Sequence, residues 1–488
     1  MTQDESAERW QKPADEDPYM QVPGSVEAPT GQVLRLNSRE LNILSTSLSE
    51  IAPPWERQIL NYVHYSIKTE TPGVHEISWT VQCEHACDYE MRVVLLAPDG
   101  DVTVCSGGTE LRSEKLGQEH ERCFLGVLPL RAGRSRLVAR VFVQSAAEVC
   151  SLELVEAQVS QRISEEASSL RHQPEWFKDA GYGLMFQWVN RTSPKYGDKV
   201  KDWEQKVKDF DVDAFADQVL EMGARYVLWS VTWGQQYISA PIKALDALLP
   251  GRTTRRDLLG EIADKLAERS IRLLFYYHFG YDCYHSIDRE WMEAAGGYKA
   301  DKTELYANLQ KIIAELGERY GQRLQGWYFD GGRRYYDAHW DSSPAEGPLS
   351  APFRELAAAA RKGNAKRMLT FNSWLWPSET PYADYTWCEW YREYEPTEEG
   401  VISGGPLKGL QAHAAFPLES HWGHLEFNTP ISAPAFNGIQ LATMVRKAKT
   451  KRYPLSINLE MYEDGSLSPL SVENLKTMKI ELQKTLPS

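Results

Sequence analysis

The chain has 488 residues, 42% of them hydrophobic, and a formal net charge of −14. A chain of this length is too long to fold around one ordinary hydrophobic core, so it predicts two domains with tails. The negative charge argues against nucleic acid or an anionic membrane as the main partner, because both would repel the chain.

The N-terminal third is predicted to be a polar tail followed by a β-rich domain. Residues 1–30 are polar and rich in proline, so we expect a disordered or extended tail. Residues 31–165 contain short β-like segments with no helix between them, and Asp99-Gly100 is typical of a hairpin turn. This pattern predicts an N-terminal β-sandwich accessory domain.

Two roles remain open for this domain. It is expected to be a structural or homo-oligomerisation module, or else a carbohydrate-binding module that presents Trp79 or Tyr89. The chain has seven cysteines and no signal-like start, which favours free thiols in a reducing cytoplasm. Cys83 and Cys87 alone lack the paired spacing of a metal site, so no metal ligand is predicted.

From residue 171 to 488, apolar strand-like runs alternate with helical stretches. Continuous apolar runs are typical of buried parallel strands. A doubly wound sheet is the main rival, but no glycine-rich phosphate-binding loop follows any run. The pattern predicts an α/β fold, a (β/α)8 TIM-like barrel, with eight strand candidates at residues 181–188, 224–233, 271–280, 324–332, 366–374, 383–391, 409–419 and 453–461.

Catalytic groups of such barrels lie at the carboxyl ends of the strands. Here those ends offer no lysine for a Schiff base, no GxSxG motif and no helical metal spacing, so no cofactor is predicted. The segment Glu419–His424 could be read as a metal site, but a sugar-contacting loop or simple packing explains it as well.

What remains is a set of carboxylates that converge on an aromatic, amide-lined pocket, which suits glycoside hydrolysis. Asp330 ends a strand-like run and is followed by two glycines, with Tyr328 on the same face. The alternative is that Asp330 caps a helix or pairs with Arg333 or Arg334. The expected partner is a carbohydrate or glycoside.

Several segments resemble one known family in the same order along the chain. They are PEWFKDAGYGLMFQW, FDVDAFADQVLEMGARYVLWS, GWYFDGG and PLSINLEMYEDGSLSPLSVENL, within residues 174–485. This set resembles the family 29 glycoside hydrolases, the α-L-fucosidases. The resemblance implies an exo-acting, retaining glycosidase with Asp330 as nucleophile and Glu389 as acid/base. Glu393 is a weaker acid/base candidate, and Glu419 or Glu460 replaces Glu389 if that residue faces away.

The resemblance and the strand ends together give the expected substrate-binding residues, which are Gln187, Trp188, Trp233, Gln235, Tyr277, His278, Tyr328, Trp374, Trp422 and Glu460. The chain departs from the family at the first two strands. Gln187 and the Gln235-Gln236 pair stand where the family has histidines that grip fucose. The sugar is therefore predicted to differ from simple fucose. Two alternatives remain, namely a non-catalytic glycan-binding protein and an inverting or otherwise atypical glycosidase.

Overall fold

The computed structural model describes residues 34–36, 43–45, 56–58, 66–83, 85–96, 101–106, 108–113, 121–279, 288–297, 299, 303–330, 351–372, 380–387, 397, 399–403 and 408–484. The predicted tail over residues 1–30 and the Asp99-Gly100 turn lie outside them.

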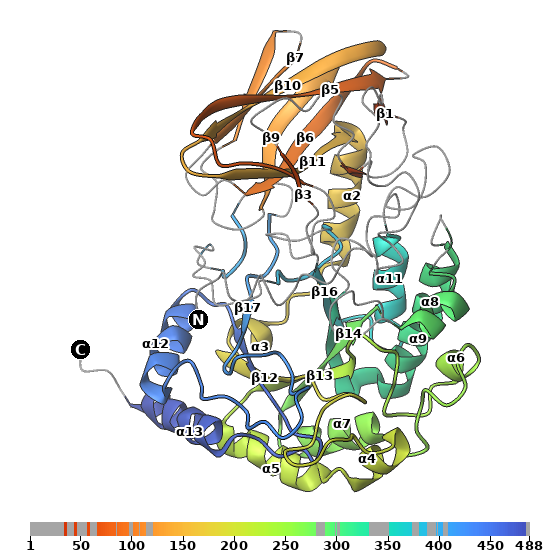
Figure 1. Ribbon diagram of the computed structural model, residues 1–488, viewed down its shortest axis with the longest axis vertical. Helices are drawn as coiled ribbons and strands as arrows, with labels where there is room; N and C mark the ends of the chain where they lie inside the picture. The colour runs from red at the N-terminus through yellow and green to blue at the C-terminus, as the bar shows by residue number, and fades with distance from the viewer. Residues whose placement is uncertain are drawn as a thin grey trace.

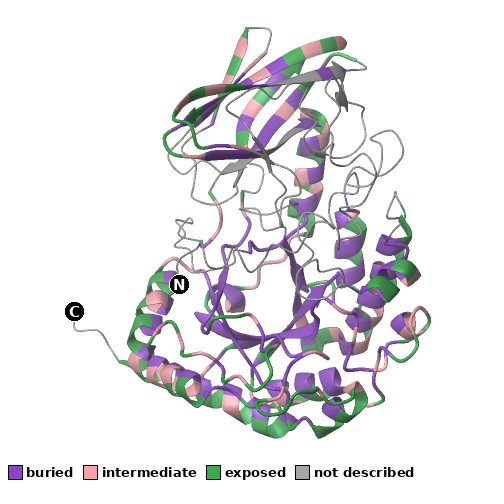
Figure 2. Cartoon of the chain, in the orientation of Figure 1, coloured by how far each residue is buried: buried purple, intermediate pink, exposed green. Residues whose placement is uncertain are grey.

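The C-terminal part is a curled parallel sheet of seven strands, consistent with a TIM-like barrel (Figure 1). The sheet order is β16-β15-β14-β13-β12-β18-β17. Long apolar stretches form these strands because both of their faces are covered, and Figure 2 shows them as a buried ring. Their bounds are β12 (Tyr182–Phe186), β13 (Tyr226–Thr232), β14 (Arg272–His278), β15 (Leu324–Asp330), β16 (Met368–Asn372), β17 (Ala414–Pro417) and β18 (Leu455–Leu459).

The segment predicted as the sixth strand, 383–391, is described over 383–387 and lies in sequence between β16 and β17. The Asp384 amide donates to the Leu369 carbonyl at 2.8 Å, and the Thr386 amide donates to the Gln411 carbonyl at 2.8 Å. The Asp384 carboxylate also accepts from the Leu369 amide, so a side chain takes one backbone bond of the ladder. Because the Asp384 side chain accepts a hydrogen bond that a backbone carbonyl would accept in a regular ladder, the segment bridges its neighbours without being a regular strand.

Strand alternation sorts the barrel side chains into two layers. On β15, Trp327 and Phe329 join the outer apolar layer that packs under the helices. Tyr328 joins the inner cluster, together with Tyr276 of β14 and Trp387. Only side chains that face inward can therefore reach the open end of the barrel.

Helices cover the outside of the strands, and local sequence fixes their ends. Asp211 caps α5 by accepting from the Ala214 amide, and Asp257 caps α7 by accepting from the Gly260 amide. Gly223 ends α5 with a φ of 82°, a conformation that favours glycine. The helices are α3 (Glu175–Lys178), α4 (Trp203–Asp209), α5 (Val212–Met222), α6 (Lys243–Asp246), α7 (Leu258–Glu268), α8 (Arg289–Ala295), α9 (Thr303–Tyr320), α11 (Phe353–Ala360), α12 (Gly438–Thr450), α13 (Pro469–Gln483) and the 3-10 turn η2 (Gly321–Arg323).

The N-terminal region is built of strands, as predicted, in two small sheets. One has the order β1-β5-β10-β7-β8, and the other has the order β3-β4-β11-β6-β9 with β2 paired to β11. One cluster of buried side chains draws on strands of both sheets. The bounds are β1 (Leu34–Leu36), β2 (Ile43–Ser45), β3 (Glu56–Gln58), β4 (Ser66–Thr69), β5 (Gly73–Cys83), β6 (Cys87–Leu96), β7 (Asp101–Ser106), β8 (Thr109–Arg112), β9 (Glu121–Leu130), β10 (Gly133–Val143) and β11 (Ala147–Glu156).

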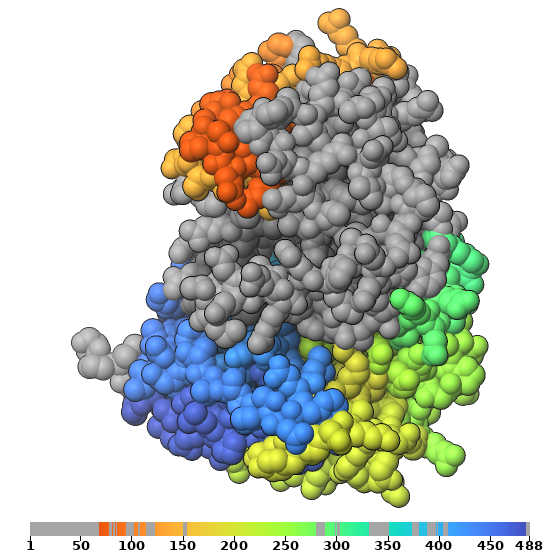
Figure 3. Space-filling view, viewed as in Figure 1, coloured from red at the N-terminus to blue at the C-terminus, as the bar shows by residue number. Residues whose placement is uncertain are grey.

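Helix α2 (Ala157–Leu170) leads from these sheets to the barrel. Its Ser160 hydroxyl donates to Glu90 of β6 at 2.6 Å. Towards its other end, Glu166 accepts from the Tyr382 hydroxyl at 3.2 Å and pairs with Arg354 at 2.6 Å. Figure 1 shows the N-terminal strands at one end of the molecule and the barrel at the other, and Figure 3 shows the same separation by colour, from red and orange at the top to yellow, green and blue at the bottom. No helix in the described part of the chain is both long and apolar enough to cross a bilayer.

Candidate active site

Asp330 is the last residue of β15 and faces the inside of the barrel, with 8% of its surface exposed. The Tyr276 hydroxyl donates to its Oδ2 at 2.5 Å, and the Asn372 side-chain amide donates to its Oδ1 at 3.2 Å. Strand register brings these groups together, because His278, Asp330 and Asn372 are aligned across β14, β15 and β16. Two neutral donors on neighbouring strands thus orient the carboxylate.

An aromatic stack lies one layer deeper on the same inward face. Tyr328 stacks on Trp387 with ring centroids 3.6 Å apart and an interplanar angle of 28°. Tyr276 packs against Tyr328 at 5.0 Å. The Trp387 indole Nε1 is buried and has no hydrogen-bond partner among the described residues. This packing fixes the direction in which Tyr276 presents its hydroxyl.

Glu460 follows β18, which is four positions from β15 along the sheet. Its Oε1 accepts from the His421 amide at 3.1 Å, and its Oε2 lies 3.4 Å from Nδ1 of His424. Glu460 and His424 are both buried. The loop after β17 therefore folds over the end of β18 and positions this carboxylate across the barrel from Asp330.

Glu419 is a second buried carboxyl group in this sector. Its Oε2 accepts from the Glu460 amide at 3.1 Å. Burial raises the pKa of Glu419 to about 8, against the opposing effect of the Ser471 hydroxyl and the Glu460 amide. The carboxyl group is thus protonated at neutral pH. Ser471 belongs to α13, so Glu419 lies against the helical layer.

Three buried polar atoms near the ends of β12 and β18 have no hydrogen-bond partner in the described part of the chain. They are Gln187 Oε1, Asn458 Oδ1 and His424 Nε2. Buried polar atoms are usually paired, so this sector retains capacity to bind hydroxyl groups.

The loop that carries His424 passes closely over Trp233. A Cβ at Gly423 would lie 2.7 Å from Cζ3 of Trp233 and 3.1 Å from Cβ of Gln187. The carbonyl of half-buried Trp422 accepts from the Asn458 side chain at 2.9 Å. A glycine at 423 is therefore required for the loop to close on the barrel end.

A buried lysine holds the loop that follows Gln187. The Lys206 ammonium donates to the carbonyls of Val189 at 2.8 Å, Thr192 at 2.7 Å and Asn190 at 3.3 Å. Burial lowers the pKa of Lys206 to about 7. Helix α4 thus anchors the backbone beside Gln187 through one side chain.

Trp188 and Tyr277 were expected to contact substrate, but their side chains lie in the outer layer, on the far side of the strands from Asp330. The Trp188 indole donates to the Glu463 carbonyl at 3.1 Å, and the Tyr277 hydroxyl donates to Gln236 at 2.7 Å. Both therefore serve packing. Tyr276 is the tyrosine of β14 that faces inward and contacts Asp330, and the signal was present in the sequence, since Tyr276 lies two residues before His278 and faces the same side of the strand.

Trp233, Gln235, His278 and Tyr328 were also expected to bind substrate. Trp233, His278 and Tyr328 are buried residues at or near the inner face of the barrel. Gln235 accepts from the Asn190 side chain at 2.7 Å. Gln236, a further strand-end residue, is committed to structure, because its side chain also donates to the His278 carbonyl at 2.8 Å.

The proposed acid/base residue Glu389, its alternative Glu393, Trp374 and Arg333 with Arg334 all lie outside the described residues.

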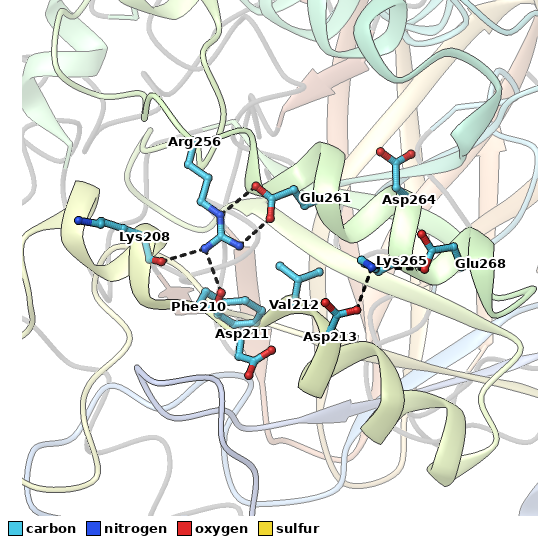
Figure 4. A pocket seen from close by; sticks show the side chains of 10 residues that line it. All are labelled: Lys208, Phe210, Asp211, Val212, Asp213, Arg256, Glu261, Asp264, Lys265 and Glu268. Atoms are coloured by element: carbon cyan, nitrogen blue, oxygen red, sulfur yellow. Dashed lines mark hydrogen bonds and ion pairs between the residues drawn. The ribbon is translucent and has the colours of Figure 1, made fainter.

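A separate surface groove of about 570 Å³ lies between α5 and α7 (Figure 4). Arg256 pairs with Glu261 at 2.6 Å and donates to the carbonyls of Lys208 and Phe210. Lys265 and Asp213 pair at 3.0 Å. These groups satisfy one another, so the groove is a charged, solvated surface rather than a reaction site.

No family model and no curated protein matches the sequence. Among solved structures, the chain is similar to an α-L-fucosidase from Lactobacillus casei in complex with α-L-fucose, with 13% identity, 63% of this chain and 97% of that chain covered, and a TM-score of 0.42. A family 29 α-L-fucosidase from Bacteroides thetaiotaomicron gives 15% identity, coverage of 64% and 75%, and a TM-score of 0.47. An endo-fucoidan hydrolase of family 107 has 14% sequence identity, with 63% of this chain and 53% of that chain covered, and a TM-score of 0.47. The solved structures similar to this chain thus include the family that its sequence segments resemble, at low identity.

Proposed function

We propose that this protein is a glycoside hydrolase, α-L-fucosidase-like, that uses a retaining mechanism with Asp330 as nucleophile. The observation that carries the proposal is the orientation of the Asp330 carboxylate by Tyr276 and Asn372 at the carboxyl end of β15. Barrel enzymes act from this end of their strands. Both of these donors are neutral groups, and each binds one oxygen of the carboxylate.

In the proposed reaction, an Asp330 oxygen attacks the anomeric carbon while the bond to the leaving oxygen breaks and that oxygen takes a proton from a second carboxyl group. Water then hydrolyses the glycosyl ester, and the second group accepts the proton of that water. Glu389 is the proposed acid/base on the strength of the family resemblance. Glu460 is the alternative, supported by its burial and by its strand position opposite β15.

The proposed sugar is neutral and differs from simple fucose. Gln187, Asn458 and His424 offer buried polar atoms to ring hydroxyls, and Trp233 offers an apolar face. Gln236 does not replace a sugar-gripping histidine in this proposal, since its side chain is used within the fold. A site built on paired polar groups rejects sugars that leave those groups unpaired.

We also propose that the two N-terminal sheets form a β-sandwich accessory domain over residues 31–165, distinct from a (β/α)8 barrel over residues 171–488. The shared buried cluster supports the sandwich, and the bridging segment 383–387 supports closure of the barrel. Homo-oligomerisation through the accessory domain stays a prediction.

The test is hydrolysis of a panel of aryl glycosides and natural glycans by the wild type, Asp330→Asn, Glu389→Gln and Glu460→Gln. We expect Asp330→Asn to lose about 10²–10⁴-fold or more in kcat, with the fold intact by circular dichroism. Product anomers followed by NMR should retain configuration. Wild-type rates in Asp330→Asn would refute the assignment. Inversion would refute the retaining mechanism, and tight glycan binding without turnover would identify a glycan-binding protein instead.

A further inference from the structure

Three side chains that can ligate a metal meet in the N-terminal region, in a cluster separate from the barrel end. One ligand atom each from His85, Cys87 and Glu156 lies within 4.8 Å of the others. Nε2 of His85 is 3.3 Å from Oε1 of Glu156. The Cys87 thiol forms no disulfide and is half-buried, and it donates to the Asp88 carbonyl at 3.5 Å.

The cluster lies at a junction of the fold. Strand β5 of one sheet ends at Cys83 and β6 of the other begins at Cys87, so His85 lies between the two strands in sequence. Glu156 ends β11, pairs in register with Tyr89 of β6, and occupies the N-cap position of α2. Its carboxylate makes no capping hydrogen bond to that helix, so the usual role of an acidic N-cap does not explain its direction.

A partly exposed histidine–glutamate ion pair explains two of the three groups. It does not explain why a thiol joins them. A thiolate, an imidazole and a carboxylate form a ligand set that zinc prefers, whereas magnesium and calcium select oxygen ligands. Zinc holds such ligands at about 2.0–2.3 Å, so small side-chain rotations would bring these three atoms onto one ion.

We propose that His85, Cys87 and Glu156 form a structural zinc site that ties the connection between the two N-terminal sheets to the first turn of α2. Binding would release the thiol proton of Cys87 and leave one coordination position for water. The His85 side chain is 50% exposed, which gives the ion an entry path. The proposal does not depend on the glycosidase assignment.

The test uses the full chain, purified without a metal-affinity tag in the presence of a non-thiol reductant. After incubation with zinc and desalting, mass spectrometry of metals should find about one zinc per chain in the wild type. Cobalt should give thiolate charge-transfer absorption in the near ultraviolet. Cys87→Ser should lose that absorption and its zinc, and Glu156→Gln should bind zinc more weakly. Cys105→Ser removes another free thiol on β7 and should keep both signals.

Circular dichroism of each variant checks that the N-terminal strands are intact. If Cys87→Ser does not fold, the wild-type cobalt spectrum and the zinc content of Glu156→Gln still decide the question. A wild type without zinc or a cobalt–thiolate band, or a folded Cys87→Ser that retains zinc, would overturn the proposal.

Discussion

The phenolic hydroxyl of Tyr276 on β14 donates to Oδ2 of Asp330 on β15 at 2.5 Å. The two residues are not paired in register. Tyr276 is level with Tyr328, two residues before Asp330, so its ring reaches up the inner wall of the barrel. The nucleophile proposed here is thus oriented from below by one strand and from the side by Asn372 of the other.

Removal of that hydroxyl should slow turnover and leave the fold intact. A hydrogen bond to a charged group contributes about 1.5–3 kcal/mol. We therefore expect Tyr276→Phe to lower kcat by roughly ten- to a hundredfold, with little change in KM. Initial rates on the best aryl glycoside measure this effect.

Tyr277→Phe is the matched control, because that hydroxyl bonds to Gln236 in the outer layer. It should lower the melting temperature and leave kcat within about twofold of the wild type. If the two variants lost equal activity, Tyr276 would have no specific role beside Asp330.

Lys206→Met should destabilise the barrel by about 1–3 kcal/mol, because it removes the donor that three loop carbonyls share and the charge that lies over the Trp188 ring. Hydrogen exchange should become faster around residues 189–192. Urea unfolding measures the loss of stability. Lys208→Met changes an exposed lysine of the same helix and should stay within about 0.5 kcal/mol of the wild type. Equal stability of the two variants would contradict the anchoring role.

Glu419 should make the protein less stable as pH rises. Its pKa is raised from 4.5 to about 8, so between these values the folded state holds a proton that the unfolded state has lost. Over that window this group lowers the free energy of unfolding by about 1.4 kcal/mol per pH unit. Glu419→Gln lacks the titrating proton and keeps an acceptor for the Glu460 amide.

Urea unfolding from pH 5 to about pH 8.5 should therefore show that the free energy of unfolding of Glu419→Gln increases relative to that of the wild type as pH rises. Glu426→Gln, which alters an exposed glutamate seven residues further on, is the matched control. Parallel curves for the wild type and Glu419→Gln would mean that Glu419 is already ionised in the folded protein.

Asp384→Asn should be strongly destabilising. Its buried carboxylate accepts from Arg361 at 2.8 and 2.9 Å and from the amides of His172 and Leu369 at 2.8 Å. The neutral side chain would leave the mostly buried Arg361 without its counter-charge, at a cost of about 3–5 kcal/mol. Thermal and urea unfolding give the magnitude.

Asp217→Asn is the surface counterpart, since Asp217 pairs with Arg269 and is 63% exposed. It should change stability by less than about 1 kcal/mol. A similar small change in Asp384→Asn would show that the buried pair does not hold the bridging segment in place.

The sequence by itself determined the alternation of buried strands and amphipathic helices, because hydrophobic periodicity and aspartate caps such as Asp211 and Asp257 are local signals. It also determined that Asp330 ends a barrel strand. The irregular bridge at 383–387 was not predictable, since a side-chain bond from Asp384 replaces a backbone bond of the strand pattern.

Only the tertiary structure decided which residues meet. Tyr276 rather than Tyr277 reaches Asp330, because alternate side chains of a strand face the inside and the outside of the barrel. His424 contacts Glu460, although the two lie 36 residues apart in the sequence. The cluster of His85, Cys87 and Glu156 brings the start of β6 next to the end of β11, although about 70 residues separate them in sequence. Such contacts depend on how strands curl and loops close, which is set by packing across each domain and not by any local pattern.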